Sequence, residues 1–142
     1  MTDKIFIDTD IILDLILARD PFIVYANELF TLIEDNKVIG HVSSLTFSNL
    51  FYILRKYESS RTAIKLLTRL RSLVHILHVD ERIIDLSLSS DFKDFEDAIQ
   101  YYTALESDIQ YLLTRNKKDY SESDIIICSA KEYLSIRVSK EL

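Results

Sequence analysis

The stretch that decides the fold is IFIDTDIILDLI, residues 5–16. It opens with a β-branched and aromatic run, typical of a buried strand, and this run stops at Asp8-Thr9-Asp10. Beyond that turn, apolar residues recur at helical spacing as far as Leu17. The pattern predicts a strand, an acidic turn and a helix, with Asp8 at the end of the strand.

The alternation of strands and helices continues along the chain. Short apolar runs predict strands at residues 38–42, 74–79, 111–114 and 125–127. Helical spacing and capping residues predict a helix capped by Asp20 that ends near Asn36, helices at 47–54, 63–70 and 94–106, a short helix capped by Asp80, and a last helix opened by the capping box of Ser129 and Glu132. We therefore expect a single α/β domain over residues 1–142. Its three α/β/α layers would surround a central, mainly parallel sheet of about five strands.

Composition excludes several classes of protein. No apolar run approaches the roughly 20 residues of a membrane span, and the first residues lack the features of a signal peptide, so we expect a soluble, cytoplasmic protein. Cys128 is the only cysteine, which rules out an internal disulfide and a Cys-based zinc site. Gly40 is the only glycine, which rules out Gly-rich phosphate loops. The net charge of −6 argues against a general nucleic-acid coat protein.

Polar residues gather where the predicted strands end, and this is where parallel sheets carry their sites. The residues are Asp8, Asp10, Ser43, Ser44, Asp80, Arg115, Asn116 and Asp119. Asp94 and Asp97 open the helix before the fourth strand, and their i, i+3 spacing places both on one helical face. Grouped carboxylates repel one another unless a cation such as Mg²⁺ neutralises them. The chemistry this suits is phosphodiester hydrolysis.

Each acidic residue also has a purely structural interpretation. Asp94 with Asp97 can be a helix cap and a first-turn acid, Asp10 can be a cap, and Asp14 can be a solvated helix residue. Asp8 is harder to explain in this way, because an unpartnered buried charge next to a strand is costly.

Basic and histidine residues offer weaker signals. Arg61, Lys65 and Arg69 fit a solvated helix face, with a phosphate-tracking surface as the alternative. Arg115, Lys117 and Lys118, at the mouth of the expected site, are better placed to contact substrate. His41, His75 and His78 share no metal-ligand spacing and are expected to be packing residues.

Four motifs in this order resemble the PIN-domain family. They are the strand followed by DTDIILD at 8–14, SSLT at 43–46, DFEDA at 94–98 and TRNKKDY at 114–120. The resemblance spans nearly the whole chain and is greatest to a bacterial PIN-like branch with asparagine at acidic positions. It implies a three-layer α/β/α fold and a Mg²⁺- or Mn²⁺-dependent ribonuclease, a group that includes the VapC-type toxins of toxin–antitoxin pairs.

The resemblance also implies roles for individual residues. Asp8 and Asp97 match the first and third metal-binding acids, whereas Asn49 and Asn116 stand where the second and fourth acids are usual. Asp94, Glu96 or Asp119 would compensate for the lost charge. The expected catalytic residues are Asp8, Asp97, Asn116 and Asp94; the expected metal ligands are Asp8, Asp97 and Asp119; and the expected supporting or substrate-contacting residues are Asp10, Ser44, Asn49, Thr114, Arg115 and Lys117.

These observations lead to a main hypothesis and two alternatives. The main hypothesis is a metal-dependent endoribonuclease that acts on RNA, with an antitoxin-like partner and a homodimer left open. The first alternative is a catalytically silent PIN-like binding module. The second is a haloacid-dehalogenase-like phosphatase with Asp8 as nucleophile and Asp10 as acid/base, although the later Gly-Asp loop of that family is missing.

Overall fold

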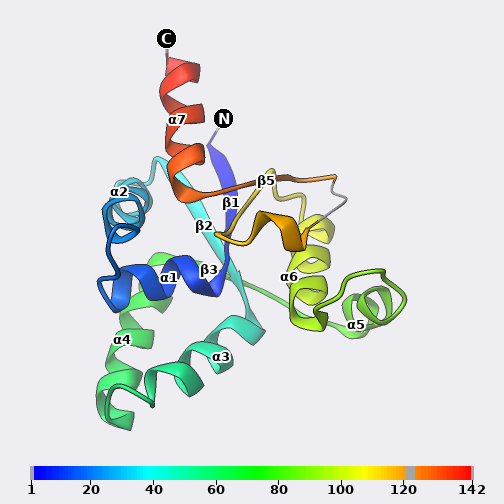
Figure 1. Ribbon diagram of the computed structural model, residues 1–142, viewed down its shortest axis with the longest axis horizontal. Coiled ribbons are helices and arrows are strands. Elements are labelled where there is room, and N and C mark those ends of the chain that lie inside the picture. The colour runs from blue at the N-terminus through cyan, green and yellow to red at the C-terminus, as the bar shows by residue number, and fades with distance from the viewer. Residues whose placement is uncertain (1, 121–123, 142) are drawn as a thin grey trace.

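A computed structural model describes residues 2–120 and 124–141 (Figure 1). In chain order its elements are β1 (Asp3–Ile7), α1 (Thr9–Ile16), α2 (Ile23–Glu34), β2 (Val38–Ser43), α3 (Ser44–Leu54), α4 (Ser60–Leu73), β3 (His75–Leu77), α5 (Glu81–Leu88), α6 (Phe95–Glu106), β4 (Tyr111–Leu113), the 3₁₀ turn η1 (Lys117–Asp119), β5 (Ile126–Cys128) and α7 (Ala130–Glu141). The predicted α/β alternation is confirmed.

The five strands form one parallel sheet in the order β3-β2-β1-β4-β5. The central strand β1 pairs with β2 and with β4, and Ile7 lies opposite Leu113 in that second pairing. The residues that follow these two strands, Asp8 and Thr114, therefore meet at one edge of the sheet. The register of β1 and β4 thus positions the side chains of Asp8 and Thr114 next to each other.

Alternate residues of β1 serve two separate cores. Ile5 and Ile7 are fully buried in a large cluster with residues of α1, α2, α3, α4 and α7. Phe6 points to the opposite face, into a smaller cluster with Tyr101 and Ala104 of α6. Ile5, Phe6 and Ile7 form a continuous apolar run because this part of β1 is buried on both faces, as expected of a central parallel strand. Figure 1 shows α1, α2 and α4 on one side of the sheet and α5 and α6 on the other, so the three-layer prediction is confirmed.

Gly40 is explained by close packing in the larger core. A Cβ atom at this position of β2 would lie 2.9 Å from Cδ1 of Ile33 on α2 and 3.2 Å from Cδ1 of Ile7. Glycine therefore allows α2 to pack closely on the sheet.

Two helix caps differ from the sequence-based predictions. Asp20 does not cap α2, because this helix begins at Ile23 and its cap residue is Phe22, without a side-chain hydrogen bond. Asp8, rather than Asp10, caps α1.

The surface predictions were partly correct. His41 is buried and donates a hydrogen bond to the carbonyl of Ile5. The ring centre of His75 lies 5.5 Å from that of His41, so His75 packs on it although it is exposed. His78 is exposed, and the prediction of a packing role was wrong for this residue. Cys128 is buried, as expected.

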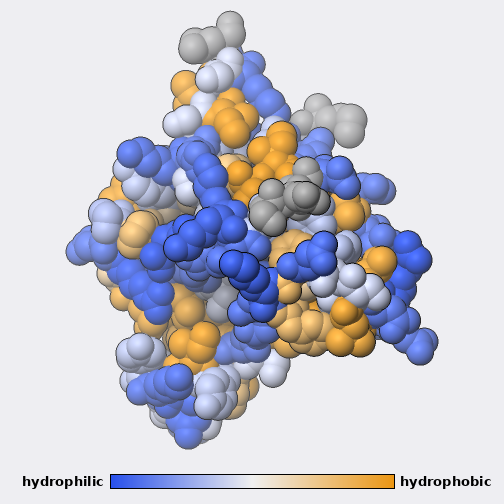
Figure 2. Space-filling model, turned by 45° about the vertical axis from the view of Figure 1, so that its right-hand side comes forward, coloured by the Kyte–Doolittle hydropathy of each residue, from blue (hydrophilic) through white to orange (hydrophobic). Residues whose placement is uncertain are grey.

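Figure 2 shows hydrophobic side chains reaching one face of the molecule among hydrophilic ones, and the exposed apolar residues include Phe22 and Tyr52. Within residues 2–120 and 124–141, no helix has both the length and the apolar character needed to cross a bilayer.

Candidate active site

A cleft of about 620 Å³ lies at the carboxyl edge of the sheet, between α1, α3 and α6. It is lined by Asp8, Thr9, Asp10, Leu13, Ser48, Asn49, Tyr52, Ile53, Glu96, Asp97, Gln100 and Asn116. The fold thus brings together the positions that the sequence singled out in four separate motifs. Its lining is dominated by carboxylates and amides.

Asp8 is held at the base of this cleft by both of its carboxylate oxygens. Oδ1 accepts a hydrogen bond from the backbone N–H of Thr9 at 2.8 Å, and Oδ2 accepts one from the hydroxyl of Thr114 at 2.9 Å. Burial raises the pKa of Asp8, and these hydrogen bonds oppose that shift. The side chain is therefore fixed in orientation while its charge is poorly solvated.

Asp10 links α1 to the loop after β4. Its Oδ2 accepts hydrogen bonds from the backbone N–H of Arg115 at 3.1 Å and from the side-chain amide of Asn116 at 3.4 Å. Its Oδ1 is buried and has no hydrogen-bond partner among the described residues. Burial, followed by repulsion from Asp8, raises the pKa of Asp10 to about 6.

Asp97 approaches the cleft from the first turn of α6. Asp94 caps this helix and accepts a hydrogen bond from the backbone N–H of Asp97 at 3.0 Å, so the structural interpretation of Asp94 is confirmed. The side chain of Asp97 lines the cleft nevertheless. Burial, then repulsion from Asp94 and Asp8, raises the pKa of Asp97 to about 7.

The two amides at expected acidic positions each donate to a carboxylate. The side chain of Asn49 on α3 donates to Glu96 on α6 across the cleft, and that of Asn116 donates to Asp10. If either asparagine were an ionised acid, it would have no hydrogen to donate and would repel the carboxylate that it faces. The two asparagines therefore reduce the repulsion in the cleft as well as its total charge.

Gln100 is a site residue that no sequence pattern singled out, whereas its partner Ser43 was expected at the end of a strand. The hydroxyl of Ser43 donates to Oε1 of Gln100 at 2.6 Å, and Nε2 of Gln100 donates to the hydroxyl of Thr46 at 3.2 Å. All three are buried, and together they join α6 to the start of α3. Gln100 follows Asp97 by three residues, and this spacing could have identified it.

Several other predicted residues lie outside the cleft. Ser44 is exposed, and its buried neighbour Ser43 forms the contacts instead. Lys117 forms an ion pair with Glu132 at 2.9 Å. Asp119 is exposed in η1, close enough to Asp97 to raise its pKa. Arg115 turns away from the cleft toward a different carboxylate.

That carboxylate is Asp14, which was expected to be solvated and is 2% exposed. Arg115 Nε lies 2.9 Å from Asp14 Oδ2, and Arg19 lies 3.8 Å from the other oxygen. The sequence-based interpretation was wrong because it considered only neighbours along the helix.

Tyr120 is a second residue without a predicted role. It is 5% exposed, and its hydroxyl is buried next to the carboxylate of Asp8. Burial, then the charges of Asp8 and Asp97, raises the pKa of this hydroxyl. The Tyr120 hydroxyl therefore stays protonated beside the carboxylates of Asp8 and Asp97.

The lining of the cleft suits a divalent cation. It contains no Lys, Arg or His among the described residues, so Asp8 and Asp97 are not neutralised by the protein itself. Oxygen ligands of this kind suit Mg²⁺ or Mn²⁺. In the part of the chain that the structure describes, no three His, Cys, Asp or Glu side chains are grouped to hold a metal, and Asp119 therefore does not complete a triad with Asp8 and Asp97. Mg²⁺ commonly uses one or two carboxylates and completes its shell with water.

The raised pKa of Asp97 predicts a pH-dependent stability. A carboxyl group with a folded-state pKa of about 7 stabilises the fold below its unfolded pKa, and this contribution is lost as the pH rises toward 7. Asp97→Asn is therefore expected to raise the melting temperature at pH 8 and to change it little at pH 4. Thermal melting of both proteins in EDTA across this range checks the sign. An equal shift at both pH values would contradict the raised pKa.

Comparison with known proteins places this architecture in a family. The PIN domain family model matches residues 4–118. Ribonuclease VapC1 of Aquifex aeolicus (strain VF5) is 26% identical over 140 residues, which cover 93% of this chain and 94% of that protein.

Two solved structures have a similar fold. A toxin–antitoxin complex from Klebsiella pneumoniae contains a chain that is 27% identical, with a TM-score of 0.60 and coverage of 81% of this chain and 88% of that one. VapBC2 from Rickettsia felis, bound to a DNA fragment from its promoter, gives a TM-score of 0.67 at 16% identity, with coverage of 89% and 97%. The family match and the carboxyl-edge cleft agree, and we conclude that the chain belongs to the PIN domain family.

Proposed function

We propose that this protein is a divalent-cation-dependent endoribonuclease that hydrolyses phosphodiester bonds of RNA as the toxin of a toxin–antitoxin pair. The observation that carries the proposal is the pair of un-neutralised carboxylates, Asp8 and Asp97, in an open cleft without a cationic side chain among its described lining residues. An RNA phosphate cannot approach such a cleft unless a cation offsets the repulsion. The similarity to a protein named Ribonuclease VapC1 supports RNA as the substrate.

In this proposal Asp8 and Asp97 hold Mg²⁺ or Mn²⁺. The bound cation would offset the charge of the phosphate and lower the pKa of a water nucleophile. Thr114 orients Asp8 through its hydrogen bond to Oδ2, and Asp94 orients Asp97 by capping α6. Asn116 lines the cleft with an amide that is only weakly held by Asp10, at 3.4 Å, and can orient water or substrate.

Three further residues support the site in this proposal: Asp10, Asn49 and Asp119. Asp10 and Asn49 shape the cleft through their contacts with the loop after β4 and with Glu96. Asp119, at the end of η1, is proposed to assist through a water molecule rather than as a direct ligand.

A protein partner is part of the proposal. The similarity to a chain of the Klebsiella pneumoniae toxin–antitoxin complex supports an antitoxin-like partner for this chain. A homodimer stays a prediction, to be measured by light scattering of the purified protein.

The function is tested with purified protein and a mixed-sequence single-stranded RNA that carries a different dye at each end. With Mg²⁺ or Mn²⁺ we expect internal cleavage that separates the two dyes, and with EDTA we expect none. A DNA strand of the same sequence is the matched substrate control.

The catalytically silent alternative makes the opposite predictions. In that case the RNA stays intact with either cation, and isothermal titration detects no Mn²⁺ binding at millimolar concentration. Those two results together would refute the proposed function.

A further inference from the structure

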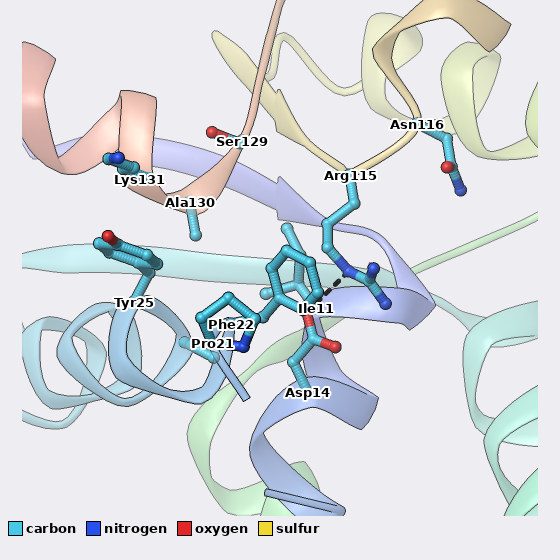
Figure 3. Close-up of a pocket in the computed structure, with 11 residues that line it drawn as sticks. Ile11, Asp14, Pro21, Phe22, Tyr25, Arg115, Asn116, Ser129, Ala130 and Lys131 are labelled. Atoms are coloured by element: carbon cyan, nitrogen blue, oxygen red, sulfur yellow. Dashed lines mark ion pairs between the residues drawn. The ribbon is translucent and has the colours of Figure 1, made fainter. Parts of the chain in front are cut away.

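A second cavity, of about 410 Å³, adjoins the acidic cleft (Figure 3). It is lined by Ile11, Asp14, Pro21, Phe22, Tyr25, Ala26, Arg115, Asn116, Ser129, Ala130 and Lys131. Asn116 lines both cavities, so the two are neighbours across the loop after β4. An extended polymeric substrate that lies in the acidic cleft would therefore pass the opening of the second cavity.

Aromatic rings form one wall of the second cavity. Phe22 is 38% exposed, although it lies in a hollow of the surface. The guanidinium carbon of Arg115 lies 4.1 Å from the centre of its ring. Figure 3 shows this ring between Arg115 on one side and Tyr25 and Ala130 on the other. Tyr25 is half-buried on α2, with the ammonium of Lys131 5.6 Å from its ring centre. The wall therefore combines flat apolar faces with positive charge.

The charge of this lining differs from that of the cleft. The cleft is lined by Asp8, Asp10, Glu96 and Asp97, whereas Asp14 is the only acid among the described residues that line the second cavity. Asp14 is already neutralised by Arg115 at 2.9 Å and Arg19 at 3.8 Å, which leaves the exposed Lys131 without an acidic neighbour in the cavity. A phosphate is favoured here and repelled in the cleft.

We propose that the second cavity binds one nucleotide of the RNA strand next to the cleaved phosphate, with its base stacked on Phe22 and Tyr25 and its phosphate facing Lys131. The inference rests on the proposed ribonuclease function and adds a subsite to it. Aromatic faces flanked by cations suit single-stranded nucleic acid, because every base offers a flat face for stacking. Continuity with the cleft through Asn116 favours RNA over a peptide as the occupant.

The test separates base stacking from charge. Binding of fluorescein-labelled oligouridylate and of an abasic ribose-phosphate chain of the same length is measured by anisotropy in the Asp8→Asn background, which prevents cleavage. We expect Phe22→Ala to weaken oligouridylate binding about tenfold and to leave the abasic chain unaffected. Phe22→Tyr should bind as the parent does. Phe22→Leu keeps the apolar bulk without the ring, and it should behave as Phe22→Ala.

Tyr57→Ala is the matched control, because Tyr57 is an exposed aromatic residue outside both cavities. Equal losses on both probes in Phe22→Ala, or no loss beyond that of Tyr57→Ala, would overturn the subsite. If the parent cleaves RNA and Phe22→Ala has no effect on binding, only the subsite fails, and the cavity is then free for a protein partner. If the parent neither binds nor cleaves RNA, the proposed function fails with it.

Discussion

Asp8→Asn is expected to reduce cation-dependent RNA cleavage by at least about a hundredfold, because it removes one of the two charges that would hold the cation. The fold should survive. Asparagine is as good a helix cap as aspartate, and the side-chain oxygen can still accept from Thr9. The raised pKa of Asp8 means that its charge destabilises the folded protein near neutral pH, so the variant should melt at an equal or higher temperature without metal. Cleavage rate, Mn²⁺ titration and thermal melting together separate lost chemistry from lost structure.

The matched control for this experiment is Asp80→Asn. Asp80 also follows a strand and caps a helix, accepting a hydrogen bond from the backbone N–H of Ile83 at 2.9 Å, but it does not line the cleft. Its amide variant should cleave RNA at the parent rate. If Asp8→Asn cleaves as fast as Asp80→Asn, then the activity does not come from this cleft.

The fold could be predicted from the sequence because its signals are local. A β-branched run that ends at Asp8 identifies the central strand, and helical spacing identifies α3, α4 and α6 without knowledge of any tertiary contact. The start of α2 was mispredicted because Asp20-Pro21 is a common helix-start pattern, and the helix begins two residues beyond Pro21 instead.

The site could be predicted only in part, for a related reason. Asp8 and Asp97 are identified by their positions relative to a strand end and a helix start. The contact between Thr114 and Asp8 spans 106 residues, but it follows from the general rule that parallel strands end at the same edge. The pairing of Asn49 with Glu96 depends on how α3 and α6 face each other, and no pattern within either helix encodes it.

The ion pair between Asp14 and Arg115 could not be predicted from patterns of neighbouring residues in the sequence. Arg115 was expected at the mouth of the site in contact with substrate, but its side chain packs on Phe22 and pairs with Asp14. Its backbone N–H meanwhile donates to Asp10. The ion pair therefore holds the loop that carries Thr114 and Asn116 against α1, and Arg115 is a positioning residue.

Asp14→Ala is accordingly expected to destabilise the protein by about 2 kcal/mol, since it leaves Arg115 next to a buried gap without its carboxylate. The value is below that of a fully buried pair because the side chain of Arg115 is 29% exposed. Urea unfolding measures the change. RNA cleavage should also fall, because the loop that bonds to Asp8 and Asp10 is no longer held in place.

Glu106→Ala is the appropriate reference, because its ion pair with Arg82 has nearly the same length, 3.0 Å, but lies at the surface. We expect it to destabilise the protein much less than Asp14→Ala does and to leave cleavage unchanged, because exposed ion pairs contribute little to stability. The double variant Asp14→Ala/Arg115→Ala should be less destabilised than the sum of the two single variants, because each single change leaves an unpaired charge. If Asp14→Ala unfolds at the same urea concentration as Glu106→Ala, burial does not strengthen this pair, and the loop is held instead by its hydrogen bonds to Asp8 and Asp10.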